Sequence, residues 1–99
     1  MTREEIIQGT LDWCNERRKE QGKSPLYRLP KGKRSDPYSC PCGRACGLAV
    51  YSLQYYDPKT RLSGWRVPMA VQEFIPLFDV GKFPEFELDD GVVNPNLGK

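Results

Sequence analysis

The sequence has 99 residues and a mass of 11.4 kDa, which is enough chain for one small domain and too little for two independent cores. It contains no histidine, which excludes Ser-His-Asp triads, imidazole proton shuttles and histidine metal sites. The net charge is +2, but residues 17–34 hold eight Lys or Arg beside one Glu, and residues 73–99 hold six acidic residues beside two lysines. This asymmetry suits nucleic-acid binding, although charge runs are more often solvated or neutralised within the molecule.

The first predicted element is a helix over residues 3–21. Thr2 and Glu5 have the spacing of a capping box, and Ile7, Leu11 and Cys14 repeat at helical spacing before Gly22 ends the pattern. Residues 23–39 hold too many prolines for a helix and are expected to form a loop that leads into a compact cysteine-containing loop.

An antiparallel hairpin is expected next, with strands over 48–56 and 61–67 joined by a turn at 57–60. A second helix follows over 69–80, with Pro76 expected to kink or split it, and residues 83–88 have the character of a short edge strand. The fold class is therefore α+β, with one domain over 1–90 and a flexible tail over 91–99. The predicted core consists of Ile7, Leu11, Cys14, Val50 or Tyr51, Leu53, Trp65, Val67, Phe74, Ile75 and Phe78.

The cysteines are the one group with the character of a metal site. Cys40, Cys42 and Cys46 have a C-x-C-x3-C spacing, and Cys14 would be the fourth ligand of an all-thiolate zinc site. Reduced buried thiols, or an adventitious disulfide, explain the same residues without a metal. Both interpretations stay open at this point.

Two local resemblances bear on origin and metal binding. Cys40-Pro41-Cys42-Gly43 resembles the C-P-C-G opening of the SEC-C zinc motif, which implies zinc and no particular activity. Residues 11–18, 39–43, 71–75, 78–79 and 81–84 are similar to segments of short proteins encoded by actinobacterial phages. That resemblance implies a phage origin and, as for many small phage proteins, binding to a host protein.

Candidate partner-binding residues come from the basic segment and from three aromatic residues. They are Arg28, Lys31, Lys33, Arg34, Tyr56, Phe83 and Phe86. We expect the aromatic side chains to form an exposed patch that suits a partner protein. The alternative partner is nucleic acid, held by the basic segment 17–34 beside the cysteines, with Tyr27 or Tyr38 stacking on bases.

No enzymatic motif is found, so a binding protein is expected. The polar start lacks the apolar run of a secretory signal, and the longest near-apolar stretch, residues 47–51, is too short for a membrane span. We therefore expect a cytoplasmic protein that does not bind membranes and whose thiols stay reduced.

Overall fold

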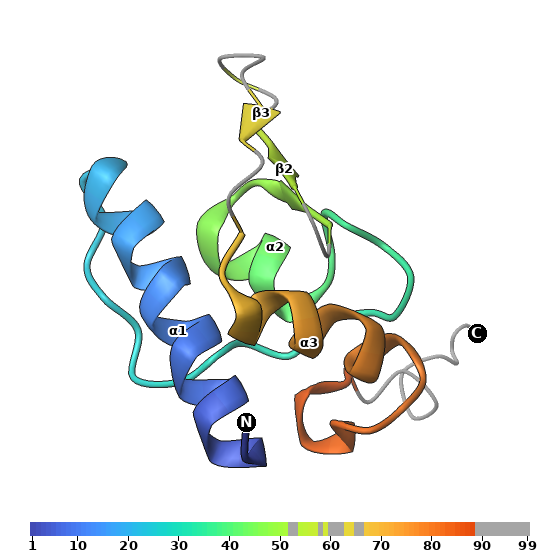
Figure 1. Ribbon diagram of the computed structural model, residues 1–99. Helices are drawn as coiled ribbons and strands as arrows, with labels where there is room; N and C mark the ends of the chain where they lie inside the picture. Colours follow the sequence, from blue (N-terminus) through green and yellow to red (C-terminus); the bar gives the residue numbers. More distant parts are fainter. Residues whose placement is uncertain (52–53, 58, 60–62, 65–66, 89–99) are drawn as a thin grey trace.

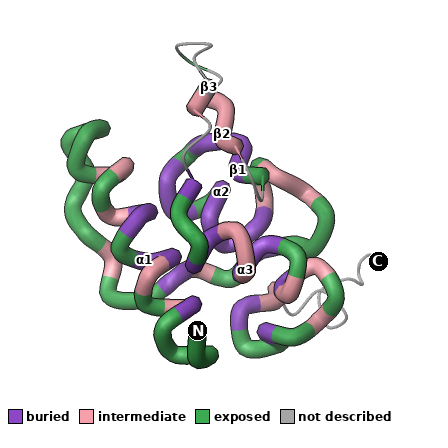
Figure 2. Tube along the Cα trace, in the orientation of Figure 1, coloured by how far each residue is buried: buried purple, intermediate pink, exposed green. Residues whose placement is uncertain are grey.

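The computed structural model describes residues 1–51, 54–57, 59, 63–64 and 67–88 (Figure 1). Within these residues, three α-helices enclose the core, and three short strands stand at one end of the molecule (Figure 1). Helix α1 (Arg3–Glu20) packs against both α2 (Pro41–Cys46) and α3 (Met69–Asp79). Buried residues concentrate where these helices meet (Figure 2). The α+β class predicted from the sequence is confirmed.

Local signals place α1 where the sequence predicts it. The Thr2 hydroxyl accepts from the Glu5 N–H at 3.1 Å, and the Thr2 N–H donates to the Glu5 carboxylate at 2.7 Å, which completes the capping box. Just beyond the helix, Gly22 adopts φ +74°, which glycine adopts without strain. The buried face differs slightly from the prediction, because Ile6 is buried and Ile7 is only partly buried.

The expectation of a cysteine-containing loop is wrong, since residues 41–46 form α2. Cys40 is its N-cap, and the Cys40 Sγ accepts from the Gly43 N–H at 3.3 Å. Pro41 occupies the first turn, where its missing N–H costs nothing, and Gly47 ends the helix with φ +71°. The sequence therefore contains every helix-ending signal, but the run is too short for helical periodicity to reveal it.

The sheet has the order β1-β2-β3, with β1 (Ala49–Val50), β2 (Tyr55–Tyr56) and β3 (Ser63–Gly64) all antiparallel to their neighbours. The pairing of β2 with β3 confirms the predicted hairpin. The single strand predicted over 48–56 is wrong, because the chain reverses between β1 and β2 and the Tyr51 N–H donates to the Gln54 carbonyl at 2.7 Å. Of the two alternatives predicted for the core at this point, Val50 is buried and Tyr51 is exposed.

Helix α3 is continuous through Pro76, and its buried side chains include Val71, Phe74 and Phe78. Pro76 lies on the exposed face, where its ring is accommodated. After α3, residues Pro84–Phe86 form the 3-10 helix η1, so the predicted edge strand is wrong.

The expectation that Phe83 and Phe86 are exposed is also wrong. Their exposed fractions are 2% and 5%, and the Phe83 ring lies 4.8 Å from the ring of Phe74, centroid to centroid. Phe86 packs edge-on against the same Phe74 ring at 6.0 Å. A partner surface built on these two rings is therefore excluded in the folded protein.

Other predictions fall outside the described residues. They concern Leu53 and Trp65 in the core, part of the 57–60 turn and the flexible tail over 91–99. No helix that the structure describes combines the length and the apolar composition needed to cross a bilayer.

Helices α1 and α3 pack closely at Gly9 of α1 and Ala70 of α3. A Cβ atom built on Gly9 would lie only 2.6 Å from the Cβ of Ala70. Glycine normally weakens a helix interior by about 1 kcal/mol relative to alanine. Here the missing side chain lets α1 and α3 pack backbone against side chain, and this contact sets their separation.

The substitution Gly9→Ala should lower the free energy of unfolding, because overpacking costs about 1–3 kcal/mol and outweighs the propensity gain of ~1 kcal/mol. Urea unfolding measures the change. The double variant Gly9→Ala with Ala70→Gly keeps the total helix propensity and removes the collision, so it should recover most of the loss. A more stable Gly9→Ala single variant would contradict this account of the α1–α3 contact.

The substitution Pro76→Ala should raise the melting temperature. Alanine supplies the N–H that the Gln72 carbonyl lacks, and an interior proline costs an exposed helix up to about 3 kcal/mol. Glu73→Ala on the same helix is the control, since it changes a side chain without adding a backbone donor. Thermal unfolding followed by circular dichroism should show a clear increase for Pro76→Ala alone, and a decrease would mean that the proline shapes a needed bend.

Candidate functional site

The structure brings the four predicted thiols together at the contact between α1 and α2. Cys14 lies on the buried face of α1, Cys42 and Cys46 lie one turn apart on α2, and Cys40 caps that helix. All four are buried and free. The Cys46 Sγ donates to the Cys42 carbonyl at 3.0 Å, and the Cys14 Sγ approaches the same carbonyl oxygen at 4.0 Å. We call these four residues the thiol cluster.

Two of the four thiols have a lowered pKa and the other two have a raised pKa. Hydrogen bonding with the thiols of Cys42 and Cys46 holds the pKa of Cys14 well below its ordinary value. Hydrogen bonding with the Cys42 thiol, assisted by the Gly43 N–H, lowers the pKa of Cys40. Burial raises the pKa of Cys42, and hydrogen bonding with Cys14 raises that of Cys46. The cluster thus favours negative charge on Cys14 and Cys40.

Three of the four thiol groups contact backbone carbonyls. The Cys14 and Cys46 Sγ atoms both face the Cys42 carbonyl, and the Cys40 Sγ lies 3.7 Å from the Pro37 carbonyl oxygen. In the described part of the chain, no three Cys, Asp or Glu side chains are already gathered around one centre as metal ligands. Binding a metal here would require the side chains to turn toward a common point.

A second feature is the basic loop, which we define as residues 23–33. Its backbone is fixed at several points by other elements. The Asn15 side chain of α1 donates to the Leu26 carbonyl at 3.0 Å and accepts from the Leu26 N–H at 2.8 Å. The Leu29 side chain is buried, and the Arg44 guanidinium of α2 donates to the Lys31 carbonyl at 2.9 Å. The loop therefore has a defined path over the surface.

The far end of the basic loop is held by the C-terminal segment. The Gly32 N–H donates to the Phe86 carbonyl at 2.8 Å, and the Leu88 N–H donates to the Gly32 carbonyl at 3.0 Å. A Cβ on Gly32 would collide with the backbone of Ser39 and Cys40, so only glycine fits this crossing. A bridge between segments more than fifty residues apart thus fixes where the loop ends.

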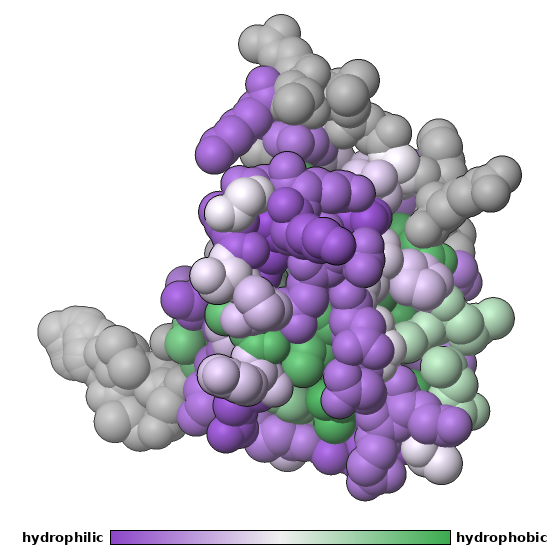
Figure 3. Space-filling view, turned by 90° about the vertical axis from the view of Figure 1, so that its left-hand side faces the viewer, coloured by the Kyte–Doolittle hydropathy of each residue, from purple (hydrophilic) through white to green (hydrophobic). Residues whose placement is uncertain are grey.

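Between these fixed points the side chains extend into solvent. Tyr27 is fully exposed, and Arg28, Lys31 and Lys33 are exposed as well. The side of the molecule formed by α1 and the segment after it is mainly hydrophilic, with a smaller hydrophobic area in its lower half (Figure 3). These residues are the part of the predicted partner surface that the structure leaves accessible.

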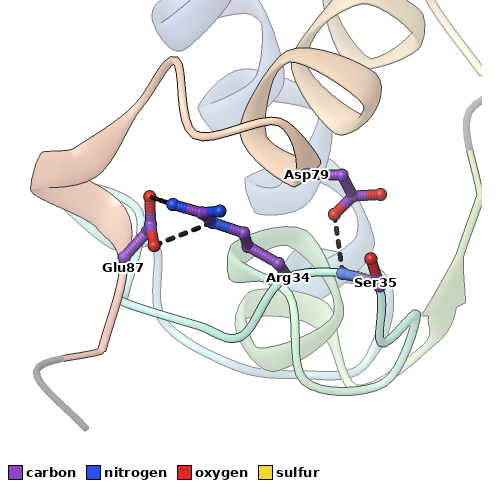
Figure 4. Close-up of polar contacts among 4 residues, drawn as sticks. All are labelled: Arg34, Ser35, Asp79 and Glu87. Atoms are coloured by element: carbon purple, nitrogen blue, oxygen red, sulfur yellow. Dashed lines mark hydrogen bonds and ion pairs between the residues drawn. The ribbon is translucent and has the colours of Figure 1, made fainter. Parts of the chain in front are cut away.

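Several basic side chains are used inside the molecule instead. Arg18 donates to the carbonyls of Ser24 and Ala45 at 2.7 and 2.8 Å. Arg34, predicted as a partner-binding residue, makes two hydrogen bonds of 2.9 Å with the Glu87 carboxylate (Figure 4). This pairing raises the pKa of Arg34 further above its ordinary value.

The residue after Arg34 is bound by a second acidic side chain. The next residue, Ser35, has φ +57°, and its N–H donates to the Asp79 carboxylate at 2.8 Å (Figure 4). Asp79 ends α3, while Glu87 follows η1, so two acidic side chains fix residues 34–35 from both sides. The tail acids therefore neutralise part of the basic segment.

The remaining candidate, Tyr56, lies on β2 and is half-buried. It is separate in sequence and in fold from Phe83 and Phe86, so the three aromatic residues form no common patch. The role of Asn15 was not recognised from the sequence. Its signal, a polar residue beside the buried face of a helix, is common to many helices.

Comparisons with protein-family models, with curated proteins and with solved structures found no match.

The substitution Asn15→Ala should loosen the basic loop without removing any of its exposed side chains. It leaves the Leu26 N–H and carbonyl without their partner, at a cost of about 1–3 kcal/mol. Hydrogen exchange should show faster exchange of the Leu26 amide. Gln8→Ala, which removes the Gln8–Asp12 hydrogen bond on the exposed side of the same helix, serves as the control and should leave Leu26 unchanged. Unchanged exchange in Asn15→Ala would mean that other contacts fix the loop.

Proposed function

We propose that this is a small binding protein that docks onto an acidic surface of a partner protein through the basic loop. The observation that carries the proposal is Tyr27, which is fully exposed on a loop whose backbone is fixed on both sides. Its neighbour Arg28 and the two lysines Lys31 and Lys33 surround it with positive charge. With the resemblance to short phage proteins, we propose a phage-encoded protein that acts on a host protein in the host cytoplasm.

The physical argument is that this loop binds without first having to become ordered. Tryptophan, tyrosine and arginine are the residues most often responsible for affinity at protein interfaces, and tyrosine buries a large area at low entropic cost. An exposed tyrosine on a flexible loop would lose that advantage through the entropy of ordering. Asn15 and Leu29 remove that cost by holding the loop in one conformation before the partner arrives.

The charge distribution favours a protein partner over nucleic acid. Arg17 pairs with Glu20, Arg18 binds backbone carbonyls and Arg34 binds Glu87, so three of the eight cations of residues 17–34 are already engaged. Nucleic-acid surfaces depend on many cations facing phosphates together, with several aromatic side chains on which bases stack. The basic loop offers one such ring, which suits a compact contact.

The proposal is tested with tagged protein and nuclease-treated lysate of an actinobacterial host, followed by affinity measurement with the captured partner. Tyr27→Ala and Arg28→Glu should each weaken binding by about 30-fold or more, as expected for central interface residues. Tyr51→Ala, an exposed tyrosine on another element, and Lys82→Glu are the matched controls and should bind as the wild type does.

A parallel measurement with single- and double-stranded oligonucleotides tests the alternative partner. The proposed function predicts no binding at physiological salt. Tight oligonucleotide binding that Tyr27→Ala weakens would favour nucleic acid and overturn the proposal. In that case the logarithm of the binding constant should fall steeply with the logarithm of the salt concentration.

A further inference from the structure

We propose that Cys14, Cys40, Cys42 and Cys46 together bind one zinc ion, which fastens α2 to α1. The four residues are all the cysteines of the chain, and the fold collects them from positions up to 32 residues apart into one buried cluster. The inference is independent of the basic loop and of any partner.

The first argument is the arrangement of the ligands on their helices. Cys42 and Cys46 are four residues apart on α2 and therefore lie on one face of that helix. The Cys14 Sγ, on the buried face of α1, lies 4.0 Å from the Cys42 carbonyl oxygen, to which the Cys46 Sγ donates at 3.0 Å. Cys40 precedes the helix and is buried at its start as the N-cap. Four buried thiols from two elements thus lie at one contact between helices, and four is the number of ligands that a structural zinc site requires.

The second argument is the use of cysteine as a helix cap. Ser, Thr, Asp and Asn are the favoured N-caps, because their oxygen atoms accept strong hydrogen bonds, whereas a neutral thiol is a weak acceptor. Cys40 nonetheless accepts the Gly43 N–H at 3.3 Å. A metal-bound thiolate accepts such a bond well, so the cap is explained if the sulfur is deprotonated.

Gly43 itself supports this geometry. A Cβ atom at this position would collide with the backbone carbonyls of Pro37 and Tyr38. Its missing side chain lets the segment before α2 fold closely over the helix start, which brings the Gly43 amide to the Cys40 sulfur. The glycine of the C-P-C-G run therefore has a structural reason.

Zinc binding converts four thiols and one Zn²⁺ into a tetrathiolate complex of charge −2 and releases four protons. The surplus negative charge needs a compensating environment. Arg18 of α1, one turn after Cys14, brings a positive charge to this helix contact, where its guanidinium donates to the Ala45 carbonyl of α2 at 2.8 Å. Thiolates are soft ligands, and four of them in a tetrahedral arrangement select zinc among the abundant divalent ions.

The Sγ atoms of Cys14, Cys40 and Cys46 face backbone carbonyls, and metal binding would draw all four sulfur atoms to about 2.3 Å from one centre. Cysteine has a single side-chain torsion angle, so the change is a set of rotations about Cα–Cβ bonds. Since zinc binding and folding are coupled in small domains, the ion is expected to enter while the chain folds.

The experiment uses the full chain, purified under reducing conditions. Elemental analysis should find about one zinc per chain, and exchange for Co²⁺ should give the intense sulfur-to-cobalt absorption of a tetrathiolate site. A strong chelator should lower the melting temperature. Zinc-free folded protein that gives no cobalt–thiolate absorption and has the same melting temperature with chelator would overturn the proposal.

Cysteine-to-serine variants test which residues bind the zinc ion. Cys14→Ser and Cys42→Ser should each lower zinc content and abolish the four-sulfur cobalt spectrum. Ala45→Ser, which adds a hydroxyl to a buried position of the same short helix, should retain both. If a cysteine variant does not fold, alkylation of the wild-type protein decides the point: the four thiols should be protected in the native state and become reactive when chelator is added. Equal protection with and without chelator would show ordinary buried thiols.

Discussion

The contact between Gly9 and Ala70 is the constraint on which the arrangement of the helices depends. It lets the backbone of α1 lie directly against the Ala70 side chain of α3, because a Cβ atom on Gly9 would be only 2.6 Å from the Ala70 Cβ. With α3 in this position, Phe74 faces the interior, and Phe83 and Phe86 fold back onto it. The ion pair between Arg3 and Glu85, with the Arg3 guanidinium 4.8 Å from the Phe83 ring centroid, then joins the start of α1 to η1.

The other faces of α1 hold the two candidate sites. Cys14 faces α2 and joins the thiol cluster, while Asn15, the next residue, turns toward the basic loop and binds Leu26. Arg18, one turn further, bridges both regions through the carbonyls of Ala45 and Ser24. A metal that fastened α2 to α1 would therefore also stiffen the support of the basic loop, so that the proposed zinc site and the proposed binding surface would share one helix.

The basic and acidic segments have a structural role that net charge conceals. Glu87 and Asp79 hold Arg34 and Ser35, and so the acidic end of the chain fixes the end of the basic segment. Exposed ion pairs of this kind contribute little stability individually. Their effect here is to occupy Arg34, which pairs with Glu87 although 49% of its side chain is exposed. Arg28, Lys31 and Lys33 are exposed as well, and with Arg34 occupied the proposed partner surface is smaller than the sequence suggests.

The sequence alone determined the elements whose signals are local. The capping box at Thr2 and Glu5, the helical repeat of α3 and the β2–β3 hairpin all follow from residues near one another in the chain, where short-range sterics and hydrogen bonds decide. The number and spacing of the cysteines likewise made them candidate metal ligands from the sequence alone. The sequence did not predict the short helix α2, because six residues are too few to show a helical period.

Only the tertiary structure decided which of those candidates share a site. It alone set the burial of Phe83 and Phe86, the pairing of Arg34 with Glu87 and the meeting of Cys14 with Cys42, since each joins segments that the chain separates. Such contacts depend on how whole helices pack. A glycine at position 9 sets that packing through the side chain it lacks, and its effect appears only when α3 lies against it.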